Sequence, residues 1–172
     1  VKTCDEKLWI DRISGERKAA IRKWTSLIAM QPGAWDIAVR HFSQGVMLHS
    51  TGDLADSVKD SLAPKASNTL HARANPMFRF VSFCNANGLE PFPISEAAVY
   101  QFLKSQDFAP TFPRSFLISL AFSFHVLGLK GDHNVLTGRT KGVAHEWFLK
   151  KRKLTQKPPL SVEQVIALES WS

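Results

Sequence analysis

The stretch "APTFPRSFLISLAFSFHVLGLKG", residues 109–131, decides the fold class predicted for this chain. Its large apolar residues recur at the three- and four-residue spacing of one helix face: Phe116, Leu117, Leu120, Phe124 and Leu127. Pro113 suits the first helical turn after Thr111, and Gly128 suits the end of the helix. The apolar run 116–129 is too short to span a bilayer. The stretch therefore predicts a buried core helix, and no membrane partner is expected.

A longer helix is predicted before this stretch, ending at Gly88. One apolar stripe runs along it at offsets of 0, 4, 7, 11 and 14 residues: Leu70, Ala74, Met77, Val81 and Cys84. Pro76 interrupts the stripe, because proline lacks an N–H and clashes with the preceding turn. Asn75 is a good N-cap and Pro76 a good first helical residue, so we expect a break or kink between them.

Two shorter helices complete the predicted bundle. Ser95 is the expected N-cap of one, and the other begins near Thr140. Their inward-facing residues are expected to be Val99, Phe102 and Leu103 in the first and Val143, Trp147 and Phe148 in the second. No stretch alternates polar and apolar residues over the length of a strand. The predicted fold class is therefore all-α, a four-to-five-helix bundle over residues 61–149.

Residues 1–60 predict a helical N-terminal arm of unknown role. Apolar residues recur at roughly helical spacing over residues 5–30, and "QPG" at 31–33 ends that helix. A second helical stretch is expected from about residue 35 to 49, where "STGD" at 50–53 breaks the pattern. This charged segment carries Trp9 and Trp24, which would also suit a protein-binding arm.

The charge of the chain is the first indication of function. A formal net charge of +7 and a pI near 9.7 attract polyanions, although charge alone fits a basic protein with no such partner equally well. The hydrophobic share of 44% supports a packed core. Only Cys4 and Cys84 are present, far apart in sequence, so we expect no disulfide framework, metal or cofactor. A reducing, intracellular compartment is the default expectation.

A search for a catalytic constellation gives nothing. None of the six histidines forms the HExxH zinc motif, because "HEWFL" at 145–149 lacks the second imidazole. "GLKGDHN" at 128–134 lacks the spacing of a phosphate-binding loop. Cys84 lies on an apolar stripe and is expected to be a core thiol rather than a nucleophile. We therefore expect that this chain is not an enzyme.

The cations are unevenly spread, which is more informative. Residues 139–157 hold seven cations and a single acid, Glu146. A second basic set, mixed with hydroxyl and amide side chains, comprises Lys65, Ser67, Asn68, Thr69, His71, Arg73 and Arg79. A third set opens the core helix and comprises Thr111, Arg114, Ser115 and Ser119. Short polar side chains at helix N-termini suit phosphate, because the exposed N–H groups and the helix dipole favour an anion there. Simple helix capping and solvated cations are the alternative for any single residue.

The order of these elements resembles the core-binding domain of tyrosine recombinases, the phage integrases and related mobile-element enzymes. The resemblance runs from residue 65 to about 170, through "SNT" (67–69), "VYQFL" (99–103), "SLAFSFHVLGL" (119–129) and "KPPLSVEQV" (157–165). Pro76 departs from the family pattern. The resemblance implies a basic, proline-containing linker over 150–159 and the first helix of a truncated catalytic domain over 160–172.

The resemblance also implies double-stranded DNA as the partner. The first and third bundle helices would approach the major groove, with candidates Lys65, Ser67, Asn68, Thr69, Arg73, Thr111, Arg114 and Ser115. Arg79 is a further DNA-binding candidate. Arg114 is the expected base-edge contact, because a guanidinium can pair with guanine through two hydrogen bonds. The phosphate contacts would come from Lys141, Lys150, Lys151 and Arg152. The family's catalytic residues lie beyond residue 172, and Tyr100 does not match its nucleophilic tyrosine, so this chain should bind DNA without cutting it.

Other functions stay open at this point. A helical protein-interaction or oligomerisation module with no DNA role is the main alternative. A helix-turn-helix regulator fits less well, because the gap from Gly128 to Arg139 exceeds its tight turn. The resemblance leaves open a homo-oligomer on DNA through the full-length parent. "KKRK" at 150–153 predicts the nucleus in a eukaryotic host, and the cytoplasm is expected otherwise.

Overall fold

The computed structural model describes residues 4–43, 51–105 and 107–150. These residues form seven α-helices and two short 3₁₀ helices, and no named strand occurs among them. The α-helices are α1 (Cys4–Met30), α2 (Asp36–Ser43), α3 (Thr51–Ser61), α4 (Ser67–Ala86), α5 (Glu96–Ser105), α6 (Phe112–Leu127) and α7 (Gly138–Leu149). The 3₁₀ helices are η1 (Pro32–Ala34) and η2 (His133–Leu136). The predicted all-α class is confirmed.

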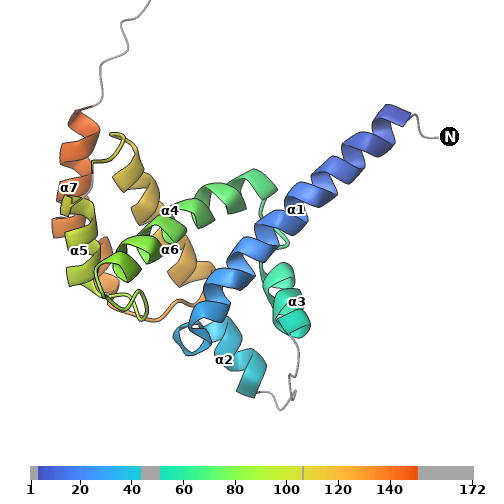
Figure 1. Cartoon of the computed structure of the whole chain (residues 1–172), viewed down its shortest axis with the longest axis horizontal. Helices are drawn as coiled ribbons and strands as arrows, with labels where there is room; N and C mark the ends of the chain where they lie inside the picture. Colours follow the sequence, from blue (N-terminus) through green and yellow to red (C-terminus); the bar gives the residue numbers. More distant parts are fainter. Residues whose placement is uncertain (1–3, 44–50, 106, 151–172) are drawn as a thin grey trace, which may run out of the picture.

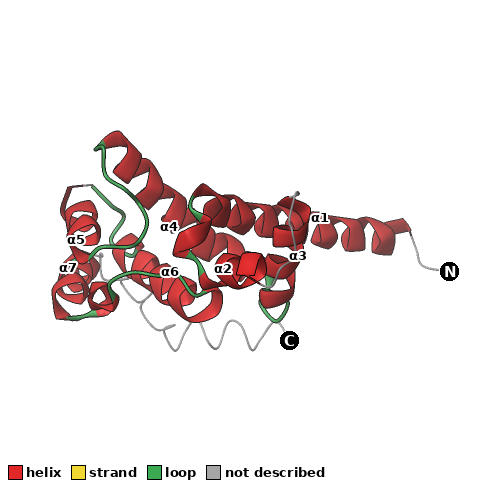
Figure 2. Ribbon diagram, turned by 90° about the horizontal axis from the view of Figure 1, so that it is seen from below, coloured by secondary structure: helices red, strands yellow, loops and turns green. Residues whose placement is uncertain are grey.

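Helix α4 is at the centre of the fold. It packs against α6 and also against α1 (Figure 1). Helices α5 and α7 lie together at the end of the molecule away from α3 (Figures 1 and 2). The inward-facing residues predicted for α6 are all buried. The stripe predicted on α4 is buried too.

An aromatic cluster fills the space between α4, α5 and α6. Phe102 of α5 lies at its centre and is 1% exposed. Its ring centroid lies between 5.0 and 6.3 Å from those of Phe80, Phe83, Phe108, Phe112 and Phe116. Offset and edge-on contacts of this kind add to the stabilisation from burial, because ring edges are positive and ring faces negative.

Helix α4 corrects one prediction, because it continues unbroken from Ser67 to Ala86 through Pro76. The Pro76 side chain is buried among the core residues, so packing offsets the hydrogen bond that its missing N–H cannot make. Asn75 does not cap a new helix. Its Oδ1 instead accepts a hydrogen bond from Lys23 Nζ of α1 at 2.8 Å.

The C-terminal half of α1 belongs to the same core as the bundle. Trp24, Leu27 and Ile28 are fully buried, and Trp24 Nε1 donates to the Leu70 carbonyl of α4 at 3.2 Å. The Arg17 side chain donates to the carbonyls of Leu62, Ala63 and Lys65 between α3 and α4. The predicted boundary between residues 60 and 61 therefore does not separate two cores.

Helix α3 is an element that the sequence reasoning missed. It begins at Thr51, inside the "STGD" stretch that was expected to break the helical pattern. Leu54, Val58 and Leu62 are buried at a spacing of four residues. These side chains meet α1 and α2, so tertiary packing overrides the weak helix propensity of the stretch.

The end of α6 holds the N-terminal segment against the bundle. Gly128 ends the helix in the left-handed conformation with φ 65°, as its position predicted. The Asp36 N–H donates to the Gly128 carbonyl at 2.8 Å, and the Lys130 N–H donates to the Ala34 carbonyl at 2.7 Å. A Cβ at residue 128 would lie 2.5 Å from the Cβ of Asp36, so only glycine fits this junction.

The ends of α4 and α5 have the caps that the sequence predicts, but one predicted core residue of α7 is exposed. Ser95 Oγ accepts from the Ala98 N–H at 3.2 Å, and Gly88 follows α4 with φ 65°. Val143 is buried and Trp147 half-buried, but Phe148 is 36% exposed and not the core residue that was predicted. Across the described part of the chain, no helix is both long and apolar enough to cross a membrane.

Candidate nucleic-acid interface

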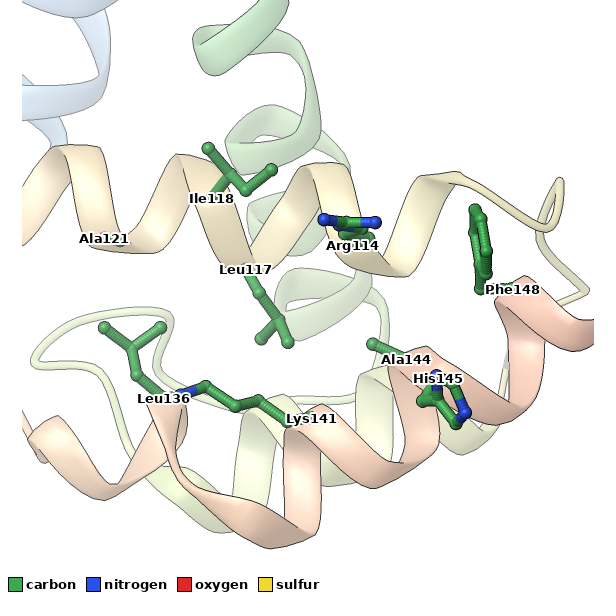
Figure 3. Close-up of a pocket in the computed structure, with 9 residues that line it drawn as sticks. All are labelled: Arg114, Leu117, Ile118, Ala121, Leu136, Lys141, Ala144, His145 and Phe148. Carbon is green, nitrogen blue, oxygen red and sulfur yellow. The ribbon is translucent and has the colours of Figure 1, made fainter.

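A groove of about 730 Å³ lies between α6 and α7 (Figure 3). Leu117 points from α6 toward α7 inside it. The lining residues are Arg114, Leu117, Ile118 and Ala121 of α6, Leu136 of η2, and Lys141, Ala144, His145 and Phe148 of α7. We call this the α6–α7 groove.

Helical periodicity explains why these side chains meet. Arg114, Ile118 and Ala121 are spaced by four and three residues, which places them along one face of α6. Lys141, His145 and Phe148 repeat the same spacing on α7. The two rows border the groove along its length, and Ile118 is 42% exposed at its rim.

The groove is cationic and its lining includes no carboxylate. The ion pairs found among the described residues do not involve Arg114, Lys141 or Lys150. The Arg114 guanidinium lies 5.8 Å from the centroid of the Phe148 ring, and Lys150 Nζ lies 3.9 Å from that of Trp147. Aromatic faces hold these cations in place without neutralising them. The groove can therefore attract an anion.

Two cations near the groove, Arg139 and Lys104, form ion pairs with acids. They are therefore less available to an anionic ligand than Arg114 and Lys141. Arg139 Nη1 contacts Glu96 Oε2 at 3.2 Å, and its guanidinium lies 3.6 Å from the centroid of the Tyr100 ring. Lys104 Nζ lies 3.5 Å from Glu146 Oε2. Arg139, counted in the cationic cluster of the sequence, is therefore committed to α5.

The candidates at the start of α4 lie elsewhere. Lys65, Asn68 and Thr69 are exposed and Ser67 is half-buried. Ala66 occupies the N-cap position, with no side-chain cap bond. Simple capping therefore does not account for this polar cluster. Ser67 lines a groove of about 690 Å³ between α1 and α3, separate from the α6–α7 groove.

The α1–α3 groove has mixed charge. Its cations are Arg17, Lys18, Arg22 and Lys59, and its acids are Asp56 and Asp60. Arg17 is already bonded to three backbone carbonyls. This groove is therefore a weaker anion site than the α6–α7 groove, although the sequence reasoning did not anticipate the cations gathered there.

The other candidates are distributed over α4, α6 and the end of α7. Arg73 is half-buried, and the Arg79 guanidinium lies 4.2 Å from the centroid of Phe112 in a third hollow. Thr111 and Ser115 occupy the first turn of α6 beside Arg114, where the Ser115 N–H donates to the Thr111 carbonyl at 3.2 Å. Lys151 and Arg152 lie outside the described residues. The groove thus brings together Arg114 and Lys141, with Lys150 at the end of α7.

Sequence reasoning missed most of the groove's other lining. Ile118, His145 and Phe148 were not candidates, although the spacing of Lys141, His145 and Phe148 could have shown that they share a helix face. Their approach to α6 could not be foreseen, because it depends on how α7 packs after η2.

Outside the groove, the described residues could still provide a nucleophile or a metal site, and Cys84 is the candidate nucleophile. Cys84 is buried, and desolvation by burial raises the pKa of its thiol from 9.0 to about 11. A thiol held protonated in this way is a poor nucleophile at neutral pH. Within residues 4–43, 51–105 and 107–150, no cluster of three or more histidine, cysteine, aspartate or glutamate side chains could hold a metal ion.

Comparison with known proteins identifies no relative. No family model matches this chain, and neither a curated protein nor a solved structure is significantly similar to it.

Proposed function

We propose that this chain binds duplex DNA through the α6–α7 groove. The observation that carries the proposal is the placement of Arg114 and Lys141 on opposite borders of one groove with no acid in its lining. The formal net charge of +7 supports it, because a basic protein concentrates a polyanion at whichever surface is not internally neutralised.

Helix α6 is the proposed reading element. Arg114, Ile118 and His125 are exposed at offsets of 0, 4 and 11 residues, so they lie along one accessible face. A major groove admits one α-helix, and its base edges offer acceptors to arginine and the thymine methyl to apolar side chains. Arg114 is therefore proposed to contact a base edge and Ile118 an apolar patch beside it.

Helix α7 is the proposed positioning element. Lys141 is exposed beside the groove and would contact a phosphate there, and Lys150 is exposed at the C-terminal end of the helix as a second phosphate contact. The first turn of α6 adds the positive end of a 16-residue helix dipole beside Thr111 and Ser115. Together these groups would fix the register in which α6 meets the bases.

A duplex titration tests the proposal. Fluorescence anisotropy of a labelled random-sequence duplex should report binding whose affinity falls as salt rises, because each phosphate contact releases a condensed counterion. The two proposed phosphate contacts, Lys141 and Lys150, predict a slope of about −2 or steeper in a plot of log K against log salt. A slope near zero, or no binding even at low salt, would contradict DNA binding.

The wider role proposed is that of the helical clamp lobe of a tyrosine-type recombinase of a mobile element. It is supported by the resemblance of residues 65 to about 170 and by the helical order of that region, with α4 packed on α6 and a basic segment after α7. In this role the chain holds one face of the duplex.

A further inference from the structure

The N-terminal part of α1 extends beyond the rest of the molecule (Figures 1 and 2). Asp11, Arg12, Ile13, Ser14 and Gly15 are all exposed, and Ile13 is 41% exposed. Five consecutive residues cover every side of a helix with 3.6 residues per turn. No side of this turn is therefore packed into the core, and from Asp11 onward the first buried residue of α1 is Ala20.

An extended helix of this length needs support in water. The segment from Cys4 to Ala19 would be about 24 Å long, and isolated helices of about 15 residues are only marginally stable. Ile13 lies on the side of α1 that borders the α1–α3 groove, whereas the midpoint between Asp11 and Arg12 lies on nearly the opposite side of the helix. A partner helix would supply the missing packing.

The sequence of this segment indicates which partner fits. Its charges are antisymmetric about the point between Asp11 and Arg12. Moving outward from that point, each charged residue is matched by one of opposite sign at the same distance: Asp11 with Arg12, Lys7 with Glu16, Glu6 with Arg17, and Asp5 with Lys18. All the charged residues between positions 5 and 18 take part.

This pattern is self-complementary in an antiparallel pair. If two copies of α1 cross antiparallel between Asp11 and Arg12, each residue lies level with its matched residue on the other copy. Cys4 would lie level with Ala19 of the second copy, just before Ala20 enters the core. The pairing would therefore run along the extended segment and leave the two bundles at opposite ends.

We propose that the extended segment of α1 is a dimerisation site for a second copy of this chain, joined antiparallel with two-fold symmetry. An isologous contact of this kind uses one patch on both copies, as the antisymmetric charges allow. Paired charges beside a helix–helix seam set partner choice and orientation. This proposal does not depend on DNA binding, since it uses residues outside the α6–α7 groove.

Contacts within one copy decide which of these charge pairs can form between two copies. The Arg17 side chain is engaged with backbone carbonyls between α3 and α4, so it does not pair with Glu6 of the second copy. Arg12 Nε lies 3.2 Å from Glu16 Oε1 on the same helix, but both side chains are well exposed and such a pair is weak. In the two-fold dimer, Asp11 of each copy lies level with Arg12 of the other copy. These two central ion pairs are therefore expected to contribute most to the attraction between the copies.

Charge exchange at the centre tests the proposal with the full chain. Asp11→Arg places four cations at the crossing point, and Arg12→Asp places four anions there. Each variant alone should weaken self-association by about tenfold or more, because like charges replace opposite ones at close range. An equimolar mixture of the two variants should associate again. In the mixed dimer, the two central cations of the Asp11→Arg copy face the two central anions of the Arg12→Asp copy. Sedimentation velocity over a concentration series measures all of these.

The controls separate this result from a general charge effect. Asp107→Arg makes the same charge change at an exposed position between α5 and α6, and it should leave self-association unchanged. Wild-type protein that stays monomeric at every concentration would overturn the proposal. Variants that associate like the wild type would also overturn it, as would a mixture that stays monomeric. A duplex titration of the same variants, with DNA affinity at low protein concentration unaltered, keeps this outcome distinct from the α6–α7 groove.

Discussion

Reversing Arg114 and Lys141 together to glutamate should weaken duplex binding by about a hundredfold at moderate salt. Both side chains border the α6–α7 groove, and neither forms an ion pair within the described residues. The change removes two cations from a surface that holds no acid of its own, and it adds two carboxylates that repel the phosphates. The slope of log K against log salt should become shallower by about one, because Lys141 is the proposed phosphate contact and Arg114 the proposed base contact. Anisotropy titrations of one duplex at several salt concentrations measure both effects.

A matched control distinguishes a local site from a general effect of net charge. Arg40→Glu with Lys59→Glu also reverses two exposed cations, but these lie on α2 and α3. This control should reduce affinity by about threefold or less, because long-range attraction is screened over roughly 10 Å at 0.1 M salt. Equal losses for the two double variants would contradict an interface at the α6–α7 groove.

Phe102→Ala should lower the free energy of unfolding by about 3–5 kcal/mol. Phe102 is 1% exposed and contacts five other phenylalanine rings, so truncation leaves a cavity that α4, α5 and α6 cannot all close. Domains of this kind are stable by only about 5–15 kcal/mol, so the variant should lose a large part of its margin. Urea unfolding followed by circular dichroism measures the change.

Phe42→Ala is the companion variant for this measurement. Phe42 lies on α2 and is 47% exposed, so its removal should cost less than about 1 kcal/mol. A loss at Phe102 no larger than that at Phe42 would show that the aromatic cluster does not organise the bundle.

The local structure of this chain could largely be predicted from residue patterns. The apolar stripes of α4 and α6, the Ser95 cap and the glycine ends at Gly88 and Gly128 follow from spacing and backbone preferences that act within one helix. Pro76 and α3 show where such reasoning fails. The Pro76 ring is accommodated because α4 is buried along its length, and α3 forms because Leu54 and Val58 meet α1 and α2.

The candidate site could be predicted only in part, for the same reason. Its cations were visible in the sequence, but their grouping depends on tertiary pairing. Arg139 and Lys104 are neutralised by Glu96 and Glu146, residues more than 40 positions away in sequence. Arg114 and Lys141 remain because α7 places no acid in the groove. The distinction between available and paired cations therefore appears only once the helices are packed.

Backbone amide NMR during a titration with random-sequence duplex locates the DNA-contacting surface of this 19.3 kDa chain residue by residue. The largest shift changes should map to α6 and α7 around Arg114, Ile118, Lys141 and His145, and they should disappear when salt is raised. Shift changes confined to the α1–α3 groove around Lys18 and Lys59, or no changes at low salt, would contradict DNA binding through α6 and α7.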